Sequence, residues 1–266
     1  MKFIQSRLIT TVCLIFVSGV VLAHDPVFGL GPHTLFKDGI ETHVGFDQSK
    51  AGDNKVMESS LEMAYGLTGN WTARVEIPYV DRDAGATGIS DIRIATKYRF
   101  WRRDGLGLQE SSTAFFKIKP DTASNDRGNS AADFILGVAY GYESRKWYRW
   151  ASVRYRFNGE ALGNVDRGDK YLIDLVSGIR FKPSAYNEPD WVWMLELNGE
   201  KTKESQLNAT TLANSGGTEW FLSPGLMWTL RNFAIKTGVQ FSVVSNLNGT
   251  QDESDYRAKL EFEWHL

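Results

Sequence analysis

The sequence has a single cysteine among 266 residues, and that residue, Cys13, lies close to the amino terminus. The chain after residue 23 therefore has no disulfide framework. The net charge is only −2, which excludes the strongly basic balance typical of nucleic-acid-binding proteins. After the first 23 residues no apolar run approaches the ~20 residues that a membrane-spanning helix needs. No linker or low-complexity segment divides the rest of the chain.

The first 23 residues have the composition of a secretory signal peptide. Lys2 and Arg7 precede an apolar run that extends from Leu8 to Leu22, and the small residue Ala23 follows it. A membrane anchor is the alternative, but the run is short for a bilayer span of ~20 residues. We assign residues 1–23 to a cleaved signal peptide and expect residues 24–38 to form a periplasmic segment.

The last stretch of the chain shows the clearest pattern. From Asp255 to Leu266 the sequence reads DYRAKLEFEWHL, in which apolar and polar side chains alternate strictly. A period of two predicts a β-strand with one apolar face and one charged face. A strand of this kind at the carboxyl terminus is typical of bacterial outer-membrane barrels, in which it closes the sheet and is recognised by the assembly machinery.

The same alternation recurs throughout residues 39–266. We predict twelve strands, each close to the ~9–11 residues of a tilted membrane strand. Between them, long polar connections alternate with connections that are mostly short, as expected for outer loops and periplasmic turns. The predicted strands are Gly39–Asp47, Lys55–Gly66, Trp71–Tyr79, Ser90–Trp101, Ser111–Lys119, Ala132–Glu143, Lys146–Phe157, Asp169–Lys182, Trp191–Glu200, Thr218–Thr229, Phe233–Val244 and Asp255–Leu266.

Tryptophans mark one end of these strands. Three begin rising strands and three end descending ones, so all six fall at the rim predicted to be periplasmic. Aromatic rings at this depth suit the membrane interface. A soluble β-sandwich is the alternative, but core aromatics have no reason to gather at one strand end. We therefore predict an all-β fold, a closed antiparallel transmembrane barrel in a bacterial outer membrane. The six residues are Trp71, Trp101, Trp147, Trp191, Trp228 and Trp264.

The polar face of the strands predicts a charged lumen. Its charges either pair across strands and hold the wall together, or line a selective path, because rings of charge set selectivity in pores. The strand that carries Arg93, Lys97 and Arg99 has only Asp91 as a carboxylate, so we expect unpaired cations that favour anionic or electron-rich solutes such as aromatic acids and phenolates. The residues predicted to line a solute path are Arg93, Lys97, Arg154, Arg156, Asp174, Glu196 and Lys236.

Enzymatic activity is not indicated. No Gly-x-Ser-x-Gly or His-Glu-x-x-His pattern occurs, and only four histidines are present. We expect no cofactor. Cleavage after Ala23 would give His24 a free amine beside its imidazole, with His33 nearby, and nitrogen ligands suit copper or zinc. His24 and His33 are therefore weak candidates for metal ligands, although an exposed terminal histidine usually has no such role.

Five short stretches are shared with known sequences: His24–Phe46, Tyr65–Val80, Gly88–Phe100, Phe116–Asp121 and Leu195–Glu200. In these stretches the chain resembles one family of outer-membrane barrels, the transporters assigned to the MetA pathway of phenol degradation. The resemblance implies an outer-membrane barrel that passes small molecules passively, with aromatic or hydrophobic compounds among them. Its partners would be membrane lipid, a small solute and, during insertion, the barrel-assembly machinery. A plugged barrel with a structural or surface-binding role is the alternative.

Overall fold

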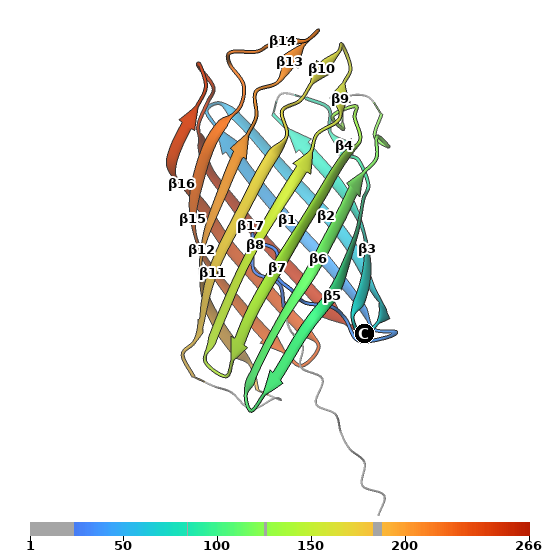
Figure 1. Cartoon of the computed structure of the whole chain (residues 1–266), viewed down its shortest axis with the longest axis vertical. Helices are drawn as coiled ribbons and strands as arrows, with labels where there is room; N and C mark the ends of the chain where they lie inside the picture. Colours follow the sequence, from blue (N-terminus) through green and yellow to red (C-terminus); the bar gives the residue numbers. More distant parts are fainter. Residues whose placement is uncertain (1–23, 84, 125–126, 183–187) are drawn as a thin grey trace, which may run out of the picture.

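A computed structural model describes residues 24–83, 85–124, 127–182 and 188–266. The predicted signal peptide lies outside these residues. Twelve long strands form a closed antiparallel barrel, which confirms the predicted fold (Figure 1). No described residue belongs to a helix that is long and apolar enough to cross a membrane. The strands are β1 (Ile40–Ala51), β2 (Asn54–Thr68), β3 (Trp71–Arg82), β5 (Arg93–Gly105), β6 (Leu108–Lys119), β7 (Asp133–Ser144), β8 (Trp147–Phe157), β11 (Lys170–Arg180), β12 (Asp190–Thr202), β15 (Gly217–Leu230), β16 (Phe233–Leu247) and β17 (Ser254–His265).

Each long strand pairs with its neighbours in the sequence, and β1 pairs with β17 to close the barrel. The closing register sets Val44 opposite Phe262 and Thr42 opposite Trp264. Pro224 has no N–H to donate, and the pairing of β15 with β16 is interrupted between Leu222 and Gly225. Complete closure leaves no free sheet edge, which is the condition for a β-structure to span lipid.

Five short strands lie within the connections at one end of the barrel. β4 (Gly88–Ile89) pairs with the end of β3. β9 (Glu160–Ala161), β10 (Val165–Asp166), β13 (Gln206–Leu207) and β14 (Thr210–Thr211) form a small separate sheet. This sheet joins two of the long connections that we predicted to be outer loops, and it stands at the upper end of Figure 1. The sequence did not predict these additions.

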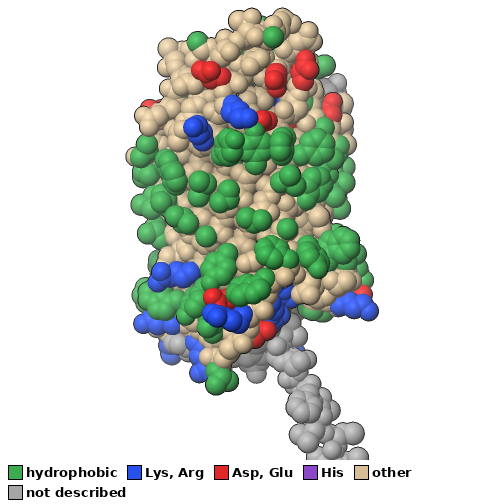
Figure 2. Space-filling view, viewed as in Figure 1, with side chains coloured by type: hydrophobic (Ala, Val, Ile, Leu, Met, Phe, Trp, Pro, Cys, Tyr) green, Lys and Arg blue, Asp and Glu red, His purple; other side chains and the backbone are tan. Residues whose placement is uncertain are grey.

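The outer face of the wall is apolar. Leu61, Met63 and Trp193 are each at least 50% exposed on it. Hydrophobic side chains spread across the middle of the wall, and charged ones gather toward its two ends (Figure 2). Trp191 lies opposite Trp228 in the strand register, and their ring centroids are 6.1 Å apart. This exterior matches the apolar band and aromatic girdle of a transmembrane barrel.

Candidate transport path in the barrel lumen

The inner face of the wall is charged and well buried. Lys97 of β5, Glu196 of β12 and Glu263 of β17 are each no more than 1% exposed. All three belong to the polar set of their strands, so the period of two places them in the lumen. The lumen therefore holds ionised groups in a confined space, where each must find a partner or ordered water.

The amino-terminal residues also lie in the lumen. We predicted a periplasmic segment at residues 24–38, but His24, Val27, Leu30 and His33 are all buried. The segment enters at the barrel end where the carboxyl terminus lies and crosses inside the wall (Figure 1). We refer to residues 24–35 as the luminal segment. Its position corrects the predicted boundary between a segment outside the barrel and the barrel itself.

Glu196 holds the middle of the luminal segment. Its Oε1 accepts a hydrogen bond from the backbone N–H of Val27 at 2.8 Å, and its Oε2 accepts one from Gly29 at 2.8 Å. The N–H of Phe28 points at the same carboxylate, 3.2 Å from Oε2. The segment bends at Val27–Gly29 and has no strand partner for these donors, so one buried carboxylate supplies the acceptors that they need.

Ion pairs fix the luminal segment on both sides of this point. Asp25 pairs with Lys97 and lies 3.5 Å from Arg74. Lys97 also donates to the backbone carbonyl of Gly31 at 3.0 Å. His33 Nε2 lies 2.7 Å from Glu143 Oε1 at the end of β7. Removing either member of such a buried pair leaves an uncompensated charge, so these contacts specify one path for the segment.

A small apolar cluster completes the attachment. Val27 packs inside the barrel with buried residues from β8, β11, β12 and β15, and Phe28 packs against the cluster. A Cβ on Gly238 would collide with the Phe28 ring, so the absence of a side chain there makes room for the segment. The residues that pack with Val27 are Trp150, Val176, Val192, Met194 and Met227.

The residues predicted to line a solute path all carry partners. Arg93 Nη1 lies 2.6 Å from both Glu58 Oε1 and Glu76 Oε1. Lys97 is bound to Asp25. The prediction of unpaired cations at Arg93 and Lys97 is therefore wrong, because Glu58 lies on a strand not adjacent to Arg93 and Asp25 lies on the luminal segment, whose position the sequence did not reveal.

The remaining predicted positions follow the same rule. Arg154 Nη2 contacts Asp174 Oδ2 at 2.6 Å, and Arg156 Nη2 contacts Asp133 Oδ2 at 2.7 Å. Lys236 Nζ lies 2.6 Å from Glu261 Oε1 and 3.1 Å from Glu263 Oε2. The structure thus places these charged residues in the lumen as members of ion-pair networks, and Glu196 of β12 as the acceptor that holds the luminal segment.

Space remains beside the luminal segment. One cavity of about 370 Å³ is lined by residues 25–30 and by side chains of β1, β2, β3, β5, β6, β16 and β17. A second cavity has a volume of about 650 Å³. Val27 and Phe28 of the segment line both cavities, and so do Asp47, Glu58, Arg93 and Lys259 of the wall. The two cavities therefore adjoin each other beside the segment.

The two cavities differ in charge. The smaller one has equal numbers of lysine or arginine and of aspartate or glutamate side chains in its lining. The larger one is lined by six cationic side chains and four carboxylates. Its cations are Arg93, Arg154, Arg156, Lys170, Arg257 and Lys259, and its carboxylates are Asp47, Glu58, Asp174 and Glu200.

The two histidines considered as metal ligands contact different residues. His33 pairs with Glu143 and packs edge-on against Trp150. His24 instead lies beside Glu263 and His265. The proximity of His24 to His265 could not be predicted from the sequence, because it depends on the luminal course of the segment.

Solved structures of outer-membrane barrels share this fold. The solved structures include the COG4313 outer membrane channel from Pseudomonas putida F1, which is 12% identical with a TM-score of 0.71 over 92% of this chain and 100% of that chain. A NanC porin is 12% identical with a TM-score of 0.52 over 85% of this chain and 100% of that chain. At these identities the likeness shows the fold. No curated protein matches the sequence. A family model described as "Putative MetA-pathway of phenol degradation" matches residues 50–243, and the chain belongs to that family.

Proposed function

We propose that the protein is an outer-membrane channel through which small molecules pass passively. The observation that carries this proposal is the pair of adjoining cavities beside the luminal segment, inside a closed transmembrane barrel. Eight-stranded barrels are filled by their own side chains, whereas water-filled porins have ~16–18 strands. A barrel of twelve strands is wide enough to hold both the segment and free space beside it. The likeness to channel and porin folds and the family membership support the same function.

We further propose that the solutes are small anions, including aromatic acids. Six cationic side chains and four carboxylates line the larger cavity, while Arg93, Arg156 and Lys259 also pair with Glu76, Asp133 and Glu261 behind that lining. Cationic groups at the surface of a narrow passage favour solutes of negative charge. Planar guanidinium groups such as those of Arg154 and Arg156 bind carboxylates in a bidentate manner and stack on aromatic rings. The family description, which names phenol degradation, supports aromatic compounds as cargo.

A plugged barrel is the second candidate function, and the anchors of the luminal segment favour it. Glu196, Lys97 and Glu143 each hold a different part of the segment. If the segment never moves and the cavities never connect, the barrel would act through its outer loops instead. Swelling of liposomes that contain the purified protein separates the two functions. A channel should admit small sugars and amino acids, and a plugged barrel should leave the swelling rate at that of protein-free liposomes.

Anion preference is tested by neutralising two cations without leaving a carboxylate unpaired. Asp133 keeps Arg167 when Arg156 is changed, and Glu200 keeps Arg257 when Lys170 is changed. The double variant Arg156→Gln, Lys170→Gln should therefore fold and should lose the anion preference, measured as the reversal potential in a potassium chloride gradient. The control Arg102→Gln, Lys146→Gln removes the same charge at exposed positions that line neither cavity and should keep the preference. Equal reversal potentials in both variants would contradict the proposed role of the larger cavity.

A further inference from the structure

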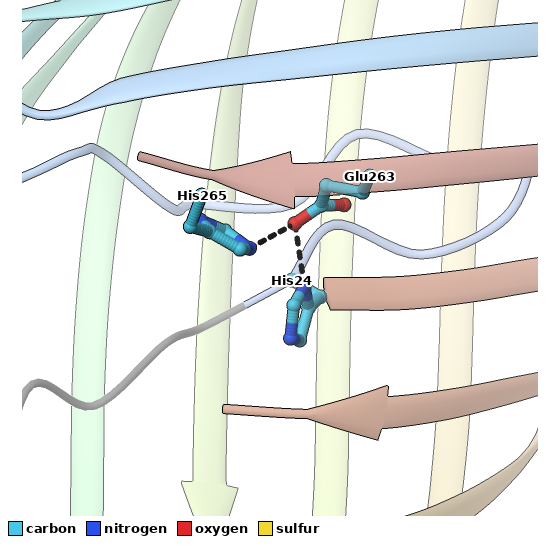
Figure 3. A group of neighbouring side chains, drawn as sticks. All are labelled: His24, Glu263 and His265. Carbon is cyan, nitrogen blue, oxygen red and sulfur yellow. Dashed lines mark hydrogen bonds and ion pairs between the residues drawn. The ribbon is translucent and has the colours of Figure 1, made fainter. Parts of the chain in front are cut away.

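Three side chains with nitrogen and oxygen donors converge where the luminal segment meets the closing strand. His24 comes from the segment, and Glu263 and His265 come from β17 (Figure 3). His24 Nδ1 lies 2.6 Å from Glu263 Oε1, and His265 Nε2 lies 2.7 Å from the same oxygen. All three residues are buried. One donor atom from each lies within 4.8 Å of the other two.

Partners hold the remaining donor atoms of the two strand residues. His265 Nδ1 lies 3.1 Å from Glu41 Oε2 on β1, which leaves Nε2 facing the cluster. Glu263 Oε2 lies 3.1 Å from Lys236 Nζ on β16, which leaves Oε1 facing the two rings. A carboxylate on the far nitrogen of a histidine is the usual support of a metal ligand, because it fixes the ring orientation and raises the basicity of the donor.

One carboxylate oxygen serves both imidazoles of the cluster. His24 Nδ1 makes a hydrogen bond with Glu263 Oε1, whereas the buried Nε2 of His265 has only an ion-pair contact with that oxygen, without hydrogen-bond geometry. A cation placed among the three donors would engage all of them at once.

We propose that His24, Glu263 and His265 form a binding site for a divalent transition metal ion, either Zn²⁺ or Cu²⁺. Two imidazoles and one carboxylate are a donor set of three that suits zinc, with a fourth position for water. Imidazole nitrogen also binds copper, which stands above zinc in the order of divalent affinities. In a chain that begins at His24, the terminal amine and Nδ1 of that residue would offer a six-membered chelate and strengthen the preference for copper.

The site would connect two parts of the fold that lie at opposite ends of the sequence. His24 begins the luminal segment, whereas Glu263 and His265 lie on the strand that closes the barrel. A bound ion would therefore tie the entry of the segment to the wall. The proposal does not depend on solute transport, since its test measures metal binding directly.

The experiment uses untagged protein that has been purified in detergent from outer membranes and freed of metal by chelation. Titration with zinc chloride or copper sulfate should saturate at one ion per chain. His24→Ala and His265→Ala should each weaken binding at least about tenfold, since even the loss of a supporting residue such as Glu41 costs roughly 10–100-fold. With Cu²⁺ bound, electron paramagnetic resonance should show nitrogen couplings that are reduced in both variants.

His33→Ala is the matched control, because His33 is also buried on the luminal segment but pairs with Glu143 instead. It should bind the ion as tightly as the native protein. A heat-modifiable band on a gel checks that each variant remains folded. The proposal would be overturned if the native protein bound neither ion stoichiometrically, or if His33→Ala weakened binding as much as His24→Ala does.

Discussion

Glu196 offers the sharpest test of how the luminal segment is held. Glu196→Gln keeps the size and shape of the side chain but replaces one acceptor oxygen by an NH₂ group. At least one charge-assisted hydrogen bond is lost, each worth ~1.5–3 kcal/mol, and the remaining oxygen is a neutral acceptor. The new amide hydrogens also face the N–H groups of Phe28 and Gly29 or of Val27. We expect the attachment of the segment to weaken by ~2–4 kcal/mol.

This loss corresponds to a change of roughly 30- to 700-fold in the population of the detached segment, at 1.4 kcal/mol for each factor of ten. The assay uses a cysteine at Leu30, which is buried, in a chain that has no other cysteine after residue 23. A maleimide joined to a bulky polymer cannot enter the lumen, so its reaction rate follows local detachment of the segment. Glu196→Gln should raise that rate by the stated factor.

Glu200→Gln is the matched control for this experiment. Glu200 lies on the same face of the same strand but pairs with Arg257 and Lys170 rather than with the segment. Its variant should leave the labelling rate near that of the native protein. If Glu196→Gln changed the rate by less than threefold in a folded barrel, the carboxylate would not be what holds the segment.

Four further predictions concern topology, the membrane face, a buried ion pair in the lumen and acid sensitivity. A cysteine in place of the exposed Asn208 should react with an impermeant maleimide on intact cells, and labelling only after the outer membrane is broken would reverse the orientation. Val239→Arg should cost ~2–4 kcal/mol near the bilayer midplane. Lys236→Ala should cost up to ~3–5 kcal/mol, because it removes the buried cation that contacts both Glu261 and Glu263. Urea unfolding in lipid vesicles measures both variants, and a neutral Lys236→Ala would refute the buried pair. Burial tends to raise the pKa of Asp91, but Lys119 and the amides of Ala123 and Thr122 hold that pKa below its usual 3.8. Asp91 therefore stabilises its loop above about pH 4, and this stabilisation is lost as the pH falls through the lower pKa of the folded state. Asp91→Asn should speed protease cleavage in residues 120–131 at pH 7, and equal cleavage rates would contradict this.

The barrel was predictable because its rule is local. Strict alternation, as in β17, fixes which side chains face lipid and which face the lumen without reference to any other strand. The predicted strands therefore all occur, with ends shifted by a few residues. The small sheet on two of the long connections was not predictable, because strands of two residues carry no periodic signal.

The course of the luminal segment was not predictable from its own residues. An extended stretch with Pro26 and Pro32 shows no helical or strand period. The signal was present in the wall instead. Val176, Val192 and Met194 occupy lumen-facing positions on adjacent strands, where the pattern otherwise places polar side chains. An apolar patch inside a polar lumen indicates that something must cover it.

The sequence could predict that charges in the lumen pair with one another, but not which residues all of the partners are. Neighbouring strands bring Arg154 to Asp174 and Arg93 to Glu76, which alternation and register could suggest. The contact of Arg93 with Glu58 crosses to a non-adjacent strand, and that of Lys97 with Asp25 needs the luminal segment. Charges on one strand therefore cannot be counted as free until the whole interior is known.

The central claim is that solutes pass this barrel even though the luminal segment crosses it. Single-channel recording of the purified native protein in a planar lipid bilayer tests that claim most directly. We predict discrete, small conductance steps that grow in Glu196→Gln, whose segment is held less firmly. Folded protein that inserts into the bilayer and yet conducts no ions, both in its native form and as Glu196→Gln, would contradict the channel and leave the plugged barrel.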